Sequence, residues 1–101
     1  MPRIALLVTT EFPPELREEI LQGLLAHRER CLRTEPGTLQ FDVLAPLDEP
    51  GCLKLVEVYA DAEAFTAHQE GASMAQYRAD TRSKITRVSA DKCLFGQELG
   101  A

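Results

Sequence analysis

Apolar residues alternate with more polar ones along four stretches of the chain, and along the remaining long stretches they recur every three or four positions. Alternation is typical of strands, and the longer period is typical of helices. The pattern predicts strands over residues 3–9, 38–44, 52–60 and 92–97, and helices over residues 14–33, 61–68 and 72–87. Two helical segments break at Gly71, so the order of elements is β-α-β-β-α-β.

The first predicted helix has the clearest boundaries. Pro14 suits its first turn, because the N–H that proline lacks would have no partner there. Glu35, Pro36 and Gly37 form a turn that ends it. Between these limits, spacings of four, four, three and four residues mark one buried stripe: Leu16, Ile20, Leu24, His27 and Cys31.

The second helical region begins at a recognisable cap. Asp61 is a good N-cap for the short helix that ends at His68. The following helix has a looser inner stripe that includes Tyr77, Ile85 and Val88. The second strand should point Leu39 and Phe41 to the same side.

This order of elements predicts an α+β fold of the ferredoxin-like type, with two helical segments on one face of an antiparallel four-stranded sheet. The other face of such a sheet is normally polar. Here residues 3–9 and 52–60 are apolar on both faces. Because so short a chain has no further element to cover the second face, we expect a homodimer formed through the sheet faces as an α+β barrel. The same pattern would also fit a larger heteromeric partner.

Composition narrows the classes of partner. The chain has 101 residues, which fits a single domain over residues 1–101, and a net charge of −5. The acidic residues are scattered and the basic ones do not cluster, which argues against nucleic acid or anionic membranes as partners. No apolar run approaches the length of a membrane span, and no secretion leader is visible, so a cytoplasmic location is expected.

The sequence contains no pattern typical of a metal or dinucleotide site. The three cysteines are far apart and form no C-x-x-C pair, and the two histidines have no metal-ligand spacing. The glycines form no G-x-G-x-x-G loop. We therefore predict neither a bound metal nor a cofactor.

Glu57 is the first candidate for chemistry. It lies between Leu55 and Tyr59 at inward positions of the third predicted strand. A buried carboxylate is costly unless it is paired or hydrogen-bonded. Glu57 is therefore either a structural partner of a helix residue or backbone, or a functional group that orients His68 or acts as a base.

Two histidines and two tyrosines extend this candidate site. His68 follows Phe65 by three residues, so both lie on the helix face that packs on the sheet. A histidine there is either a satisfied core residue or a general base, since its usual pKa of about 6.5 allows proton transfer near neutral pH. His27 suits core filling or the cavity wall, and Tyr59 and Tyr77 either cap the core or bind a substrate oxygen.

Four segments, in order along nearly the whole chain, resemble the antibiotic biosynthesis monooxygenase family: residues 35–44 (EPGTLQFDVL), 55–59 (LVEVY), 61–68 (DAEAFTAH) and 95–96 (FG). The resemblance implies a dimeric α+β barrel whose cavity is lined by the histidine of the A-F-x-x-H motif, here His68. It is closest to the branch of quinol monooxygenases and quorum-signal isomerases. The isomerases have a second histidine where this chain has Ser73.

The resemblance implies a cofactor-independent monooxygenase that oxidises a small aromatic quinol or enol with dioxygen. His68 and Glu57 would be catalytic, with substrate-binding side chains supplied by Tyr59, Tyr77, His27 and Phe65. Two alternatives stay open: an isomerase of a small phosphorylated signal molecule, and a non-catalytic dimeric module for ligand binding or stress response.

Overall fold

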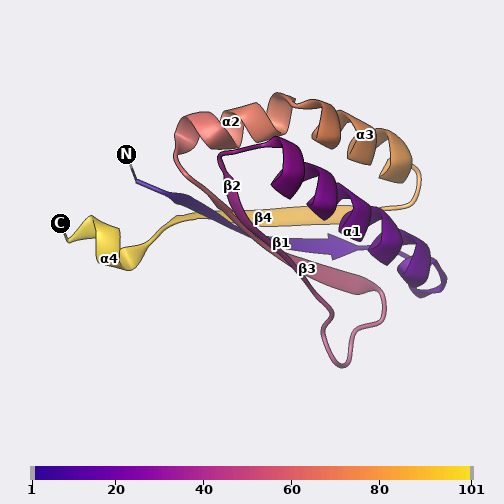
Figure 1. Cartoon of the computed structure of the whole chain (residues 1–101). Helices are drawn as coiled ribbons and strands as arrows, with labels where there is room; N and C mark the ends of the chain where they lie inside the picture. Colours follow the sequence, from indigo (N-terminus) through magenta and orange to yellow (C-terminus); the bar gives the residue numbers. More distant parts are fainter. Residues whose placement is uncertain (1, 101) are drawn as a thin grey trace.

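The computed structural model describes residues 2–100 as a four-stranded antiparallel sheet with helices along one face (Figure 1). The strand order is β2-β3-β1-β4. The main elements follow the predicted β-α-β-β-α-β order: β1 (Ile4–Glu11), α1 (Arg17–Thr34), β2 (Thr38–Leu44), β3 (Cys52–Tyr59), α2 (Ala62–Glu70), α3 (Ala72–Thr81) and β4 (Arg87–Leu94). A 3-10 turn, η1 (Pro14–Leu16), precedes α1, and a short helix, α4 (Gly96–Leu99), follows β4. The predicted ferredoxin-like α+β fold is confirmed.

The core lies between the helices and the two central strands. Alternate residues of β1, beginning at Ile4, are buried beneath the helices, and the same holds for β3 from Leu53 to Tyr59. The antiparallel register places Leu6 opposite Glu57 and Val8 opposite Leu55. Glu57 is thus the one carboxylate in an otherwise apolar patch of the central sheet.

The fourth strand differs from the sequence prediction. It spans Arg87–Leu94 rather than residues 92–97, and α3 ends at Thr81 rather than at residue 87. The strand pairs along the whole of β1, from Arg87 opposite Glu11 to Leu94 opposite Ile4. Because the helices leave β4 largely exposed, its sequence does not need the apolar alternation that reveals a buried strand.

A bulge corrects the predicted faces of β2. The register with β3 shifts between Thr38 and Gln40, so Thr38 and Phe41 face the helices. Leu39 was expected beside Phe41, but its side chain is 51% exposed. The extra residue of a bulge turns the side chain to the other face.

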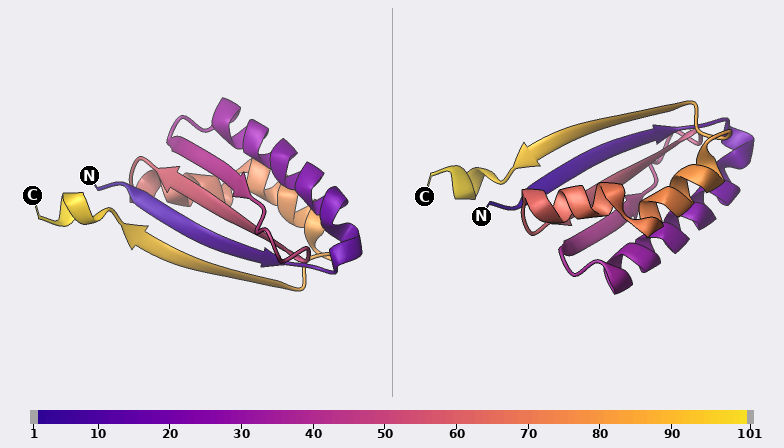
Figure 2. Two further views of the ribbon diagram at one scale, coloured as in Figure 1. Left: turned by 90° about the horizontal axis from the view of Figure 1, so that it is seen from below. Right: turned by 90° about the horizontal axis from the view of Figure 1, so that it is seen from above.

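The second face of the sheet is not covered by any element of residues 2–100, because α1, α2 and α3 all lie on one side (Figure 2). Leu7 and Leu44 on this face are 49% and 50% exposed. Within the same residues, no helix combines the length and the hydrophobicity that crossing a membrane requires.

Candidate active site

A cavity of about 450 Å³ lies between the sheet and the helices. Its polar groups include His27 of α1, Glu57 of β3 and His68 of α2. Most of its wall is apolar and comes from β1, β3, β4 and the α2–α3 region, including Leu6, Val8, Leu55, Phe65, Met74, Ile85 and Val88. Such a wall suits a mostly apolar organic molecule.

His68 is fixed by a hydrogen bond that sequence analysis did not predict. The helix that carries it begins at Asp61, whose carboxylate accepts a hydrogen bond from the Ala64 backbone N–H at 2.8 Å. The imidazole is 3% exposed, and its Nδ1 lies 2.9 Å from Oε1 of Glu35. Because a carboxylate can only accept, Nδ1 carries the proton, and Nε2 is left as the acceptor nitrogen.

Glu35 is itself held in place. The Thr38 hydroxyl donates to the same Oε1 at 2.8 Å, and the Glu35 backbone N–H donates to the Cys31 carbonyl at the end of α1. The sequence marked residues 35–37 only as the turn that ends a helix. Since Glu35 and His68 are 33 residues apart, no local period connects them, and an acidic residue directly after a helix was the single available signal.

Glu57 lies on the other side of His68, as its inward strand position predicted. It is buried, and its Oε1 accepts a hydrogen bond from the Tyr59 hydroxyl. The same oxygen is 3.8 Å from His68 Nε2, which is too long for a hydrogen bond but close enough for electrostatic attraction. Burial raises the pKa of Glu57, while the Tyr59 hydrogen bond and the nearby His68 oppose that shift. The hydrogen-bonding partner that orients His68 is therefore Glu35, rather than Glu57.

The other predicted site residues divide into two groups. His27, Phe65 and Tyr77 line the cavity, and the rings of His27 and Tyr77 stack with centroids 4.7 Å apart. Burial raises the pKa of Tyr77 to about 12, so its hydroxyl stays protonated at neutral pH. Tyr59 is fully buried and is not part of the cavity wall, because its hydroxyl is directed at Glu57. Burial and the Glu57 charge raise the pKa of Tyr59 as well.

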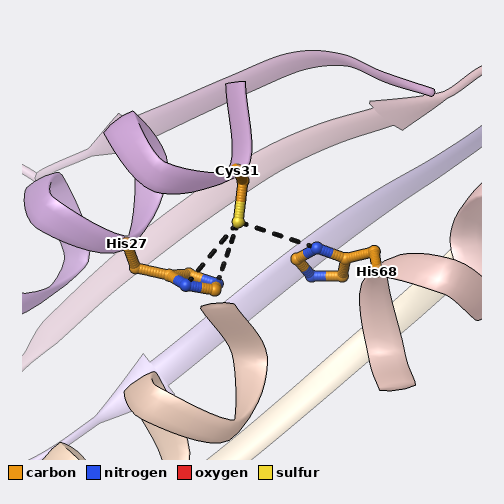
Figure 3. A group of neighbouring side chains, drawn as sticks. All are labelled: His27, Cys31 and His68. Carbon is orange, nitrogen blue, oxygen red and sulfur yellow. Dashed lines mark hydrogen bonds between the residues drawn. The ribbon is translucent and has the colours of Figure 1, made fainter. Parts of the chain in front are cut away.

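His27, Cys31 and His68 form a buried cluster (Figure 3), and its two histidines also line the cavity. The Cys31 sulfur lies 3.6 Å from both ring nitrogens of His27 and 3.7 Å from Nδ1 of His68. Their potential ligand atoms all lie within 4.8 Å of one another, so these are the residues that could approach a metal ion. However, Nδ1 of His68 is already hydrogen-bonded to Glu35. As arranged, the three form a hydrogen-bonded packing cluster.

Burial also sets the protonation of two members of this cluster. It raises the pKa of the Cys31 thiol to about 12, with a further contribution from Glu35, so the thiol is protonated. It lowers the pKa of His27 to about 4, assisted by the charges of His68 and Arg30, so His27 is neutral at physiological pH. Because His27 and the Cys31 thiol are both uncharged, they can be buried in a packed cluster without the cost of burying a charge.

Comparison with solved structures supports the fold. A protein from Bacteroides thetaiotaomicron, named as a candidate antibiotic biosynthesis monooxygenase, matches with a TM-score of 0.85 and 24% identity, over 91% of this chain and 88% of that one. A protein of the same description from Caulobacter crescentus matches with a TM-score of 0.86 and 19% identity, over 91% of this chain and 88% of that one. No curated protein matches the sequence.

The family itself is shown by the sequence match. The family model for antibiotic biosynthesis monooxygenases matches residues 3–80. This range runs from β1 through all but the last residue of α3 and includes His27, Glu35, Glu57 and His68. The family match supports a general monooxygenase function, and the structural neighbours support the fold. The chain belongs to the antibiotic biosynthesis monooxygenase family.

Proposed function

We propose that the protein is a cofactor-independent monooxygenase that oxidises a small aromatic quinol or enol with dioxygen. The observation that carries this proposal is the setting of His68 at the wall of a largely apolar cavity. Its Nδ1 donates to Glu35 at 2.9 Å, and its Nε2 lies on the side of Glu57. This leaves a basic nitrogen in the part of the site where a substrate hydroxyl would enter.

In the proposed first step, Nε2 of His68 accepts the proton of the substrate hydroxyl. The resulting imidazolium lies between two carboxylates, Glu35 at Nδ1 and Glu57 near Nε2, and both stabilise its positive charge. The Tyr77 hydroxyl lines the same cavity and is protonated, so it is available to donate to a substrate oxygen. Tyr59 acts through Glu57, whose position it fixes.

The substrate anion is electron-rich and transfers one electron to dioxygen, after which the two radicals combine at a ring carbon. The O–O bond then breaks. One oxygen atom stays on the ring and the other leaves as water with two hydrogens from the substrate. A quinol thus gives a hydroxyquinone and water. The substrate itself supplies the two electrons that reduce the second oxygen atom to water.

The positions of His68 and Glu57 also bear on the alternatives. If His68 pointed away from the cavity, a non-catalytic module would be favoured. Instead, both His68 and Glu57 line the cavity. The isomerase alternative is weakened at Ser73, where a second histidine would be needed for a two-histidine proton shuttle. Ser73 is buried near the start of α3 and is not among the cavity-lining residues.

We further propose that the active form is a homodimer in which two sheets face each other. The support is the uncovered face of the sheet, where Leu7 lies opposite Val56 of β3, and where Leu7, Val56 and Leu44 of β2 line one depression. This apolar patch would be removed from water if the sheet of a second copy covered it, which favours the dimer.

The test is oxygen uptake with a panel of chemically reduced quinols and enols, using purified protein treated with a chelator and no added cofactor. The expected result is uptake well above autoxidation without protein, with one dioxygen consumed per quinol. With ¹⁸O₂, one labelled atom should appear in the product and the other in water. Failure of every substrate to raise uptake above autoxidation would contradict the proposal.

A further inference from the structure

The wall of the cavity carries acidic and basic side chains at different levels along the sheet. Its Glu57 end is level with Leu6 of β1, and its other end is level with Thr10, which pairs with Val88 of β4. Four residues of strand separate Leu6 from Thr10, a length of roughly 13 Å. At this second end, α3 closes over the start of β4 (Figure 1), and Arg82 joins the cavity wall.

Two arginines of this wall differ from the neighbouring cations. Lys84 pairs with Glu19 at 3.2 Å, and Arg87 pairs with Glu11 at 3.7 Å. Arg78 and Arg82 line the cavity, and within residues 2–100 neither has a carboxylate within the 4.0 Å of an ion pair.

The two arginines are placed to act together. They are four residues apart around the end of α3, so they project from the same side of the helix. Arg78 donates one N–H to the carbonyl of Gln69, the residue after His68, at 3.3 Å. Its guanidinium therefore lies beside the end of α2, and its other donors stay available. In a chain of net charge −5, two cations without carboxylate partners on one cavity form a ready site for an anion.

We propose that the substrate carries an oxyanion, a carboxylate or a phosphate ester, on the opposite side of its aromatic body from the reacting hydroxyl. Arg82, at the far end of α3, binds this anion through the planar N–H pairs that match carboxylate and phosphate oxygens, and Arg78 adds a second cation on the same side of the helix. The inference rests on the proposed function, because it takes the Glu57–His68 end as the place of the hydroxyl. The length of the cavity calls for roughly 10 Å between hydroxyl and anion, which suits a bicyclic arene better than a single ring.

Binding without turnover tests this inference. Titration calorimetry under anaerobic conditions compares 6-hydroxy-2-naphthoate with the neutral 2-naphthol and with the shorter 4-hydroxybenzoate. We expect the hydroxynaphthoate to bind at least about tenfold more tightly than either, as charge-assisted hydrogen bonds predict. Added salt should reduce its affinity but leave that of 2-naphthol nearly constant. A 6-hydroxy-2-naphthyl phosphate arm shows which of the two oxyanions binds more tightly.

Variants locate the anion site. Arg82→Gln should reduce the affinity ratio of hydroxynaphthoate to 2-naphthol from about tenfold or more to less than about threefold, and Arg78→Gln combined with it should abolish the preference. Arg87→Gln is the matched control and should keep the ratio. Arg87 is only five residues after Arg82, but it pairs with Glu11 and is not part of the cavity wall. Circular dichroism checks that each variant is folded.

Equal affinities of the wild type for the charged and neutral naphthalenes would overturn the inference, as would an unchanged ratio in a folded Arg82→Gln variant. Because dioxygen is absent, these outcomes are separate from the proposed oxidation. An anion preference without oxygen uptake would leave the anion site in place and contradict the monooxygenase. Oxygen uptake on neutral quinols without any anion preference would support the monooxygenase and contradict the anion site.

Discussion

Glu35 decides which nitrogen of His68 is basic, since its carboxylate holds the proton on Nδ1 at 2.9 Å. In Glu35→Gln an amide replaces the carboxylate, and its NH₂ can donate to Nδ1 and shift the proton to Nε2. We expect kcat for quinol-dependent oxygen uptake to fall by about 10²–10⁴-fold with a smaller change in KM, as for other histidine bases in the wrong tautomer. Glu29→Gln, at an exposed position of α1, is the control and should keep kcat.

His27 should make the folded state sensitive to acid. Burial, with the charges of His68 and Arg30, lowers its pKa to about 4, whereas in the unfolded chain the pKa is about 6.5. Between these values the unfolded state binds more protons, so the free energy of unfolding falls as the pH falls through this window. The expected loss from pH 7.5 to pH 5 is about 2 kcal/mol.

The measurement for His27 is urea unfolding at both pH values, for the wild type and for His27→Gln. The variant removes the titrating ring, so its stability should change less between the two pH values, whatever its absolute stability. An identical pH dependence in the two proteins would show that His27 is not the titrating group.

At the scale of elements, the turn between α1 and β2 determines how Glu35 meets α2. Gly37 lies directly against Ala64 of α2, so that an added Cβ would clash with the Ala64 side chain, and its carbonyl accepts from the Ala60 N–H at 2.9 Å. Gly37→Ala must push α2 away from the turn. We expect a loss of about 1–3 kcal/mol in stability and a lower oxygen-uptake rate.

The matched control is Gly23→Ala, in the middle of α1, where an added Cβ meets nothing within 4 Å. There the substitution should stabilise the protein by up to about 1 kcal/mol, because alanine is the better helix former. Thermal or chemical unfolding of both variants provides the comparison. Equal effects at the two positions would contradict the close contact between Gly37 and α2.

Elements with strong local signals were predictable from the sequence. The period of α1, the alternation of β3 and the capping residue Asp61 all place their residues as the structure does. The prediction was wrong at β4, because an exposed edge strand needs no apolar alternation, and at Leu39, because nothing local announces a bulge.

In the candidate site, too, residues on regular elements were predictable and contacts between distant segments were not. Glu57 and His68 could be found because each sits on a regular element whose period reveals its inward face. Glu35 and the proximity of Cys31 to both histidines could not, since they depend on how the end of α1 packs against α2. Long-range packing of this kind has no period in the sequence.

For the whole molecule, the central prediction is the sheet-to-sheet homodimer. Leu7→Glu places a charge in the middle of the uncovered face, where burial would be costly, so light scattering after size exclusion should show a monomer. Leu47→Glu is the control, because Leu47 is fully exposed in the loop between β2 and β3 and lies off the sheet face, and it should remain dimeric. A monomeric wild type would contradict the predicted assembly.

The most direct test of the account is oxygen uptake by His68→Ala with a quinol that the wild type oxidises. We predict that the variant keeps the helical and strand content and the oligomeric state of the wild type, but that its uptake falls by at least about 10²-fold, towards the rate of autoxidation. Uptake at the wild-type rate in a correctly folded His68→Ala protein would contradict the role of His68 as the base.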